Sequence, residues 1–202
     1  MMNELSRFTE QIRNYIPFNE EEIRDRELIL ACLAHEQDIF TRENKLVHFS
    51  ASGWVVNPGR TKVLLAYHNI YQSWTWLGGH ADGETDLLQV ALREVKEESG
   101  VTHVRPVTEE IFSLESLTVD GHIKRGAWVS SHIHLNLTYL LEASEEDLLT
   151  VKADENSGVA WFPIEEALTV PDEPWMVEHI FTKLNQKLLH IPERNLLWKS
   201  TF

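Results

Sequence analysis

The stretch from residue 77 to residue 101 constrains the fold more than any other part of the chain. It begins with two neighbouring glycines, Gly78 and Gly79, and continues into a segment whose apolar residues recur at helical spacing. Asp86 stands where a helix N-cap is expected, with a glutamine three residues later, and Gly100 stands where a left-handed residue ends a helix. The sequence therefore predicts a glycine-rich loop followed by a helix that begins after Asp86 and ends before Gly100.

This predicted helix carries three carboxylates, Glu94, Glu97 and Glu98, on one side. Positions i, i+3 and i+4 are neighbours on a helix, so the three side chains fall within an arc of about 100°. Two unit charges ~5 Å apart repel by about 3 kcal/mol at an effective dielectric constant of about 20. Either the carboxylates take up protons or a cation neutralises them, and ligand sets made only of oxygen suit Mg²⁺ or Mn²⁺. A solvated acidic face is the alternative interpretation.

The same residues resemble the signature of a known protein family, the Nudix box G-x5-E-x7-R-E-U-x-E-E-x-G-U, in which U is aliphatic. Gly79 matches its first glycine, and the nine residues from Arg93 onward match its second half without a gap. One position departs, because Thr85 stands where the box has its first glutamate. We expect a neighbouring acidic residue, Glu84 or Asp86, to compensate by pairing with Arg93.

The resemblance implies a fold of the α+β class, a Nudix-type α/β/α sandwich with a mixed sheet. It also implies hydrolysis of a diphosphate bond in a nucleoside diphosphate linked to another group, with Mg²⁺ or Mn²⁺ as the cofactor. By this resemblance Glu94, Glu97 and Glu98 are the metal ligands and the core of the catalytic set. The backbone carbonyl of Gly78 or Gly79 would supplement them, since a glycine lets the main chain approach closely.

Further site residues follow from the same resemblance. Arg93 would join the catalytic set by holding a box glutamate in place through a charge-assisted hydrogen bond. The general base stays open between the box and a later loop, where Asp154 and Glu155 are candidates and a solvated turn is the alternative. An aromatic ring offers a stacking surface for a base, although core packing is the competing role for each tryptophan. The residues expected to contact the substrate are Gly79, His80, Trp54 and His134.

Two histidines, His132 and His134, alternate in a segment that predicts a strand, so both point to one face of the sheet. A pair with this spacing binds metal in some barrel proteins, but the sequence shows no further ligands for such a site. The other two interpretations are a pair that faces the substrate in the cleft and the ordinary polarity of a strand.

The rest of the chain predicts one domain. Residues 48–56 and 62–68 alternate as a hairpin, and residues 127–142 predict one long strand or a bulged pair. A short helix is expected over residues 163–168 and a final amphipathic helix over residues 174–190. We expect three segments: an N-terminal helical extension over residues 1–45, a Nudix core over 46–170, and a C-terminal helix and tail over 171–202.

The N-terminal extension is expected to be helical over residues 3–45. One helix would be closed by Pro17, and a second would be capped by Asn19 and run to about Glu36. The segment shows no obvious chemistry, so we interpret it as a lid or a packing extension. The sequence leaves open whether it also forms the interface of a homodimer.

The amino-acid composition limits the classes of binding partner that are expected. The net charge of −14 argues against a nucleic acid polymer or an anionic membrane as partner, since both are polyanions. The small-molecule nucleoside diphosphate derivative is the expected partner. A single cysteine, the absence of a signal-peptide pattern and the lack of ~18 consecutive apolar residues together predict a cytoplasmic protein.

Two other functions compete with hydrolysis. A Nudix fold can serve as a ligand-binding regulator without hydrolysis. Such proteins usually carry an added DNA-binding module, and the acidic composition of this chain does not favour DNA binding. A diphosphate isomerase shares the fold and needs an active-site cysteine near the strands, whereas Cys32 lies in a predicted helix.

Overall fold

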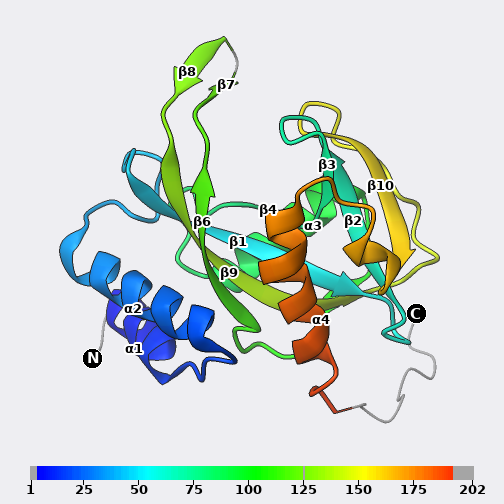
Figure 1. Cartoon of the computed structure of the whole chain (residues 1–202), viewed down its shortest axis with the longest axis horizontal. Coiled ribbons are helices and arrows are strands. Elements are labelled where there is room, and N and C mark those ends of the chain that lie inside the picture. Colours follow the sequence, from blue (N-terminus) through cyan, green and yellow to red (C-terminus); the bar gives the residue numbers. More distant parts are fainter. Residues whose placement is uncertain (1–3, 125, 193–202) are drawn as a thin grey trace.

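The computed structural model describes residues 4–124 and 126–192, and it begins with a helical hairpin (Figure 1). The hairpin consists of α1 (Glu4–Asn14) and α2 (Glu20–His35), and the side chain of Asn19 caps α2 by accepting the N–H of Glu22. Both predicted helices are confirmed. Residues 36–45 are not helical but form bends and turns, because Glu36 adopts an extended backbone (φ −97°, ψ 148°) and Asp38 a positive φ of 55°, neither of which continues a right-handed helix.

A mixed sheet forms the centre of the molecule. Its main path runs β10-β2-β1-β9-β5, and β3, β4 and β6 pair at its sides with β2, β1 and β9. The two central strands, β1 and β9, are parallel, and the other pairs are antiparallel. The strands are β1 (Val47–Val56), β2 (Lys62–His68), β3 (Ser73–Thr75), β4 (Leu77–His80), β5 (Val104–Pro106), β6 (Ser113–Val119), β9 (His132–Ala143) and β10 (Asn156–Pro163).

The glycine-rich segment differs from the prediction, because β4 is a strand and not a loop. Gly78 and Gly79 pair with Ser52 and Ala51 of β1, and the turn begins only after His80. The pairing is close, since a Cβ added at Gly78 would lie 2.5 Å from the carbonyl oxygen of Ala51. Glycine is needed here for close backbone approach within a sheet.

Helices cover both faces of the sheet, which confirms the α/β/α sandwich. Behind the sheet in Figure 1 lies the box helix α3 (Leu87–Ser99), and in front lies α4 (Thr182–Leu188), preceded by the π-helical turn η2 (Met176–Phe181). One apolar core joins α1, α2 and α3 to the sheet, and a second joins η2 and α4 to the opposite face. Together η2 and α4 form the predicted C-terminal helix.

The caps of α3 are as predicted. Asp86 accepts the N–H of Gln89 at 3.2 Å, and Gly100 ends the helix in the left-handed region with φ 77°. The long strand or bulged pair expected over residues 127–142 is divided into two strands. β8 (Ala127–Val129) pairs with β7 (His122–Lys124) and projects from the sheet (Figure 1), and only β9 joins the sheet. The short helix after β10 is the 3₁₀ turn η1 (Glu166–Leu168). Within the described ranges no helix has the length and apolar character to cross a membrane.

Candidate active site

A cleft of about 980 Å³ opens between the box helix, strand β4 and the loop before β10. Its volume is within the range of small-molecule sites. Polar side chains of the central strands line part of it: Ser50 and Ser52 both donate to the side-chain oxygen of Asn136. The acidic lining residues are Asp82, Glu84, Glu94, Glu97, Glu98, Asp154, Glu155 and Glu173.

Three carboxylates converge in this cleft. Glu94 and Glu98 of α3 and Glu155 of the loop before β10 each offer an oxygen, and these oxygens lie within 4.8 Å of one another. Glu98 is buried and accepts the backbone N–H of Gly78 at 3.0 Å. Burial is the main cause that raises the pKa of Glu98 to about 8, and the charges of Glu94 and Glu155 act in the same direction.

Arg93 holds a box glutamate, as predicted. Its guanidinium donates to Glu94 at 2.9 Å and lies 4.0 Å from Glu97. The expected compensation for Thr85 is wrong, because Glu84 accepts the backbone N–H groups of Thr85 and Asp86. Asp86 is occupied in turn as the cap of α3, so these two carboxylates order the turn before the helix and do not pair with Arg93.

Glu97 lies apart from the three converging carboxylates. Its side chain is 47% exposed and forms an ion pair with Lys152 at 3.2 Å. Lys152 also contacts Glu155 at 2.9 Å, so one lysine links the box helix to the later loop. The metal-binding role expected for Glu97 remains a prediction, whereas the structure brings Glu155 to the position beside Glu94 and Glu98.

Close packing fixes Glu94 from the side of strand β4. A Cβ added at Gly79 would lie 2.5 Å from the carboxyl carbon of Glu94. The first glycine of the box is therefore needed because the carboxylate occupies the space of a side chain at that position.

The residues expected to contact substrate separate into two groups. Gly79, His80 and His134 line the cleft. Trp54 does not reach it: the side chain is fully buried in the second core, with its ring 5.3 Å from that of Phe181. The alternation of β1 explains the difference, since Trp54 points to the face that packs on η2.

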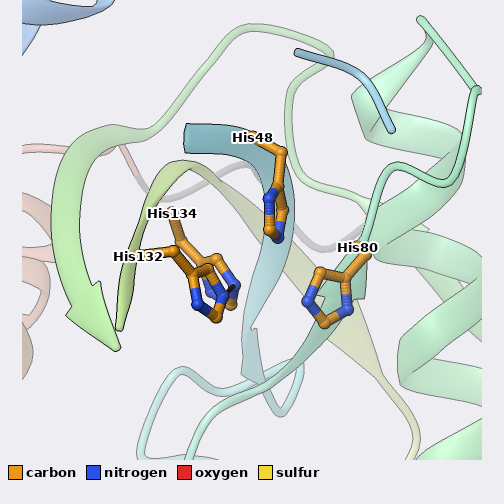
Figure 2. Close-up of side chains that lie close together, drawn as sticks. All are labelled: His48, His80, His132 and His134. Atoms are coloured by element: carbon orange, nitrogen blue, oxygen red, sulfur yellow. Dashed lines mark hydrogen bonds between the residues drawn. The ribbon is translucent and has the colours of Figure 1, made fainter. Parts of the chain in front are cut away.

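The strand histidines have partners that the sequence did not show. His132 and His134 converge with His48 of β1 and His80 of β4 (Figure 2). Burial lowers the pKa of His80 to about 3 and that of His134 to about 2, so both rings are neutral at pH 7. His48 was missed because the parallel pairing of β1 with β9 joins residues far apart in the chain, for which no local pattern exists.

The three converging carboxylates fit a hard divalent cation. They supply only oxygen, as Mg²⁺ and Mn²⁺ prefer, and their mutual repulsion is relieved by a positive ion. Burial first, and then the charges of Glu94 and Glu155, raise the pKa of Glu98 even with Lys152 nearby, so a positive ion would favour its ionised form. Glu94, Glu98 and Glu155 are therefore the described residues that could hold such a cation.

The mixed sheet lies between helical layers and places a carboxylate-lined cleft beside a glycine strand. Together with the match to a family of hydrolases, this arrangement identifies an enzyme that acts on phosphoric anhydride bonds. The chain belongs to the Nudix family, whose domain model matches residues 47–182. A comparison with curated protein sequences gave no significant match.

Solved structures share the fold at low sequence identity. The Ap4A hydrolase of C. elegans is 21% identical with a TM-score of 0.51, and the match covers 70% of this chain and 95% of that one. A NUDIX-family hydrolase from Clostridium perfringens is 20% identical with a TM-score of 0.51, over 71% and 97% of the two chains. The hydrolase RenU of M. smegmatis is 18% identical with a TM-score of 0.52, over 73% and 89%.

Proposed function

We propose that the protein is a metal-dependent pyrophosphohydrolase that cleaves the diphosphate bond of a nucleoside diphosphate linked to another group. The observation that carries this proposal is the convergence of Glu94, Glu98 and Glu155 beside the Gly78–Gly79 segment of β4. Membership of the Nudix family supports the reaction type, and the cleft volume of about 980 Å³ accommodates a nucleotide derivative.

The cation would be Mg²⁺ or Mn²⁺, held by Glu94, Glu98 and Glu155, with the carbonyl of Gly78 as the expected backbone ligand. Such an ion neutralises charge on diphosphate oxygens and lowers the pKa of a bound water. Glu97 is proposed as an outer ligand, since its carboxylate must leave Lys152 to join the others.

The protein's own groups position this site. The N–H of Gly78 and the guanidinium of Arg93 orient the carboxylates of Glu98 and Glu94. Glu155 would give one carboxylate oxygen to the cation, and we propose that its other oxygen accepts the proton of the attacking water, because Glu155 lies in the cleft beside Glu94 and Glu98.

The test is a panel of nucleoside diphosphate derivatives, incubated with Mg²⁺ or Mn²⁺ and followed by identification of the products. The panel includes Ap4A, since the enzyme of C. elegans with the same fold is named for it. We expect release of a nucleoside monophosphate or another phosphorylated product from at least one member, and complete loss of activity in EDTA.

Activity that survives EDTA would contradict the metal-dependent mechanism. Binding of a nucleotide without hydrolysis of any member would favour a ligand-binding regulator instead. An isomerase has less support, because Cys32 lies on α2, outside the residues that line the cleft.

A further inference from the structure

A second group of side chains that could hold a metal ion includes His80 and His134 of the cleft lining. It consists of His48 on β1, His80 at the end of β4, and His132 and His134 on β9, and each offers a nitrogen within 4.8 Å of the others. The sheet brings them together, because His48 is in register with His134 on the parallel neighbour. Figure 2 shows His132 and His134 on one side, His80 on the other and His48 between them.

Backbone carbonyls fix the orientation of two of these rings. The Nδ1 of His48 lies 3.0 Å from the carbonyl oxygen of Asn44, and the Nδ1 of His132 lies 2.9 Å from that of Ser130. A carbonyl only accepts, so Nδ1 carries the proton and the neutral ring keeps a lone pair on Nε2. This outer contact from Nδ1–H to a carbonyl is the usual support of a histidine that binds metal through Nε2.

The lone pair on Nε2 of His48 has no partner. His48 is only 4% exposed, and no hydrogen-bond partner of Nε2 occurs in the part of the chain that the structure describes. The Nε2 atoms of His132 and His134 lie 3.0 Å apart, and one proton between them satisfies that pair alone. A buried acceptor without a partner is unfavourable, so the cluster is incomplete without a ligand that serves several lone pairs.

The spacing of the rings fits one central ion. Four imidazoles bound to zinc at about 2.0–2.1 Å in a tetrahedron place their ring centres about 5 Å apart. The ring centre of His48 lies 5.2 Å from that of His80, 4.9 Å from that of His132 and 5.0 Å from that of His134. The ring centre of His134 lies 4.8 Å from that of His80 and 4.9 Å from that of His132.

We propose that His48, His80, His132 and His134 bind one transition-metal ion of the zinc class, at a site separate from the cation held by the glutamates. Imidazole suits Zn²⁺, Cu²⁺, Ni²⁺ and iron, whereas Mg²⁺ and Mn²⁺ prefer the carboxylate oxygens of Glu94 and Glu98. Four protein ligands close the coordination sphere, as in structural zinc sites.

The ion would join three strands at one point. His80 is the last residue of β4 and follows Gly79, whose position leaves room for the carboxylate of Glu94. An ion on His80 therefore ties the glycine strand to β1 and β9 and holds it against the box helix. The proposed role is to stabilise the strand on which the carboxylate site depends.

The experiment measures zinc bound by the full chain after removal of metal with a chelator. We expect the stripped protein to take up one tightly bound Zn²⁺ per chain that excess Mg²⁺ does not displace. X-ray absorption of this zinc should show a first shell of nitrogen with imidazole scattering. A first shell made of oxygen, or zinc that Mg²⁺ displaces, would overturn the proposal without any variant.

Substitutions of single histidines test which residues bind the zinc. His132→Gln and His48→Gln should weaken zinc binding by more than about 100-fold, the upper end of the effect of losing an outer-shell partner. Glu98→Gln should retain the nitrogen-bound zinc, because the proposed site contains no carboxylate. His35→Gln is the matched control, since His35 is an exposed histidine at the end of α2. Equal zinc affinity in His132→Gln and the control would reject the site.

A second readout separates binding from folding. Zn²⁺ should raise the melting temperature of the stripped wild-type protein and of His35→Gln, and should leave that of His132→Gln unchanged. Circular dichroism of the stripped variants checks that they fold. If a variant fails to fold, the absorption spectrum of the wild-type zinc decides the question alone.

Discussion

Glu98 is the residue on which the proposed chemistry most depends. It is buried, it accepts the N–H of Gly78, and its burial beside Glu94 raises its pKa. Glu98→Gln removes a charged ligand at unchanged volume. The loss of several kcal/mol of charge stabilisation corresponds to a fall in kcat of roughly 10³-fold. The free energy of unfolding should stay equal or rise, because repulsion is relieved; kinetics and urea denaturation measure the two quantities.

Glu97 provides the internal comparison for this prediction. Its carboxylate is half exposed and paired with Lys152, outside the three converging carboxylates. We predict that Glu97→Gln lowers kcat less than Glu98→Gln, by about 10-fold, since an exposed ligand contributes less charge stabilisation. Equal losses in the two variants would show that Glu97 leaves Lys152 and binds the cation directly, as the family resemblance implies.

Substitution of the two glycines of β4 by alanine should affect different properties, activity at Gly79 and stability at Gly78. At Gly79 the new Cβ meets the carboxyl group of Glu94, so displacement of that ligand should cost about 10²-fold in kcat. At Gly78 it meets the backbone of Ala51, so the sheet should lose about 1–3 kcal/mol of stability. Gly59→Ala is the control, because the nearest atom lies 3.8 Å away. Steady-state kinetics and thermal melts of all three variants test the contrast.

At this scale the sequence predicts local features and misses distant ones. The caps at Asp86 and Gly100 and the pairing of Arg93 with a box glutamate were all predictable, because each depends on residues close together in the chain. The convergence of Glu155 with α3 and of His48 with β9 depends on strand pairing across the sheet. No periodicity within one segment carries that information.

Among the elements, α2 is anchored by one buried acid. Glu22 is fully buried and accepts hydrogen bonds from Lys187 at 2.6 Å, Tyr15 at 2.7 Å and Ser113 at 2.7 Å. Glu22→Ala leaves a buried lysine without its partner, which should cost about 3–5 kcal/mol of unfolding free energy. Glu27→Ala is the matched control on the same helix: its exposed pair with Arg24 should contribute less than about 1 kcal/mol. Urea denaturation at pH 7 measures both values.

The same acid predicts a pH dependence. Burial opposes its charge, yet Lys187 and Lys183 hold the pKa of Glu22 below its ordinary value of 4.5. The contribution of Glu22 to stability is therefore complete above pH 4.5 and is lost as the pH falls through the lowered value of the folded state. The stability difference between wild type and Glu22→Ala should narrow over this acidic range, and a difference independent of pH would contradict the assignment.

The hairpin of β7 and β8 contributes a cation to an acidic cleft. Lys124 lines the cleft, and within residues 4–124 and 126–192 no carboxylate lies at ion-pair distance from it. It is therefore suited to contact a phosphate. Lys124→Ala should raise KM roughly fivefold, equivalent to about 1 kcal/mol, with little change in kcat. The effect should shrink at high salt, whereas Lys96→Ala, an exposed position outside the cleft lining, should show none.

For the whole molecule, the class and layers of the fold were predictable and the shape of the cleft was not. The Nudix box predicted α3. The change from helical spacing to alternation of apolar residues along the chain predicted the order of helices and strands. The projection of the β7–β8 hairpin from the sheet depends on where β9 begins, and the alternation over residues 127–142 continues through that point. The role of the N-terminal helices was equally undetermined, because an amphipathic hairpin suits both a lid and a layer of core.

The structure favours the interpretation that the N-terminal helices form a layer of the apolar core. Phe8, Ile12 and Ile29 are buried in the same apolar cluster as Phe49 of β1, and Glu22 joins α2 to Lys187 of α4. Ile12→Ala should therefore cost about 2–5 kcal/mol of unfolding free energy, as for other buried isoleucines. Leu5→Ala is its control on α1: the residue is 46% exposed, so the change should cost less than about 0.5 kcal/mol.

Removal of residues 1–45 extends this test to the whole extension. A lid could be removed with the fold intact and with altered turnover, whereas a layer of core cannot, because its loss exposes Phe49 to water and leaves Lys187 without Glu22. We predict that the shortened chain melts at least about 10 °C below the full chain, since several kcal/mol shift the melting temperature by a few degrees each. An unchanged melting temperature with a changed kcat would contradict this prediction and support the interpretation of residues 1–45 as a lid.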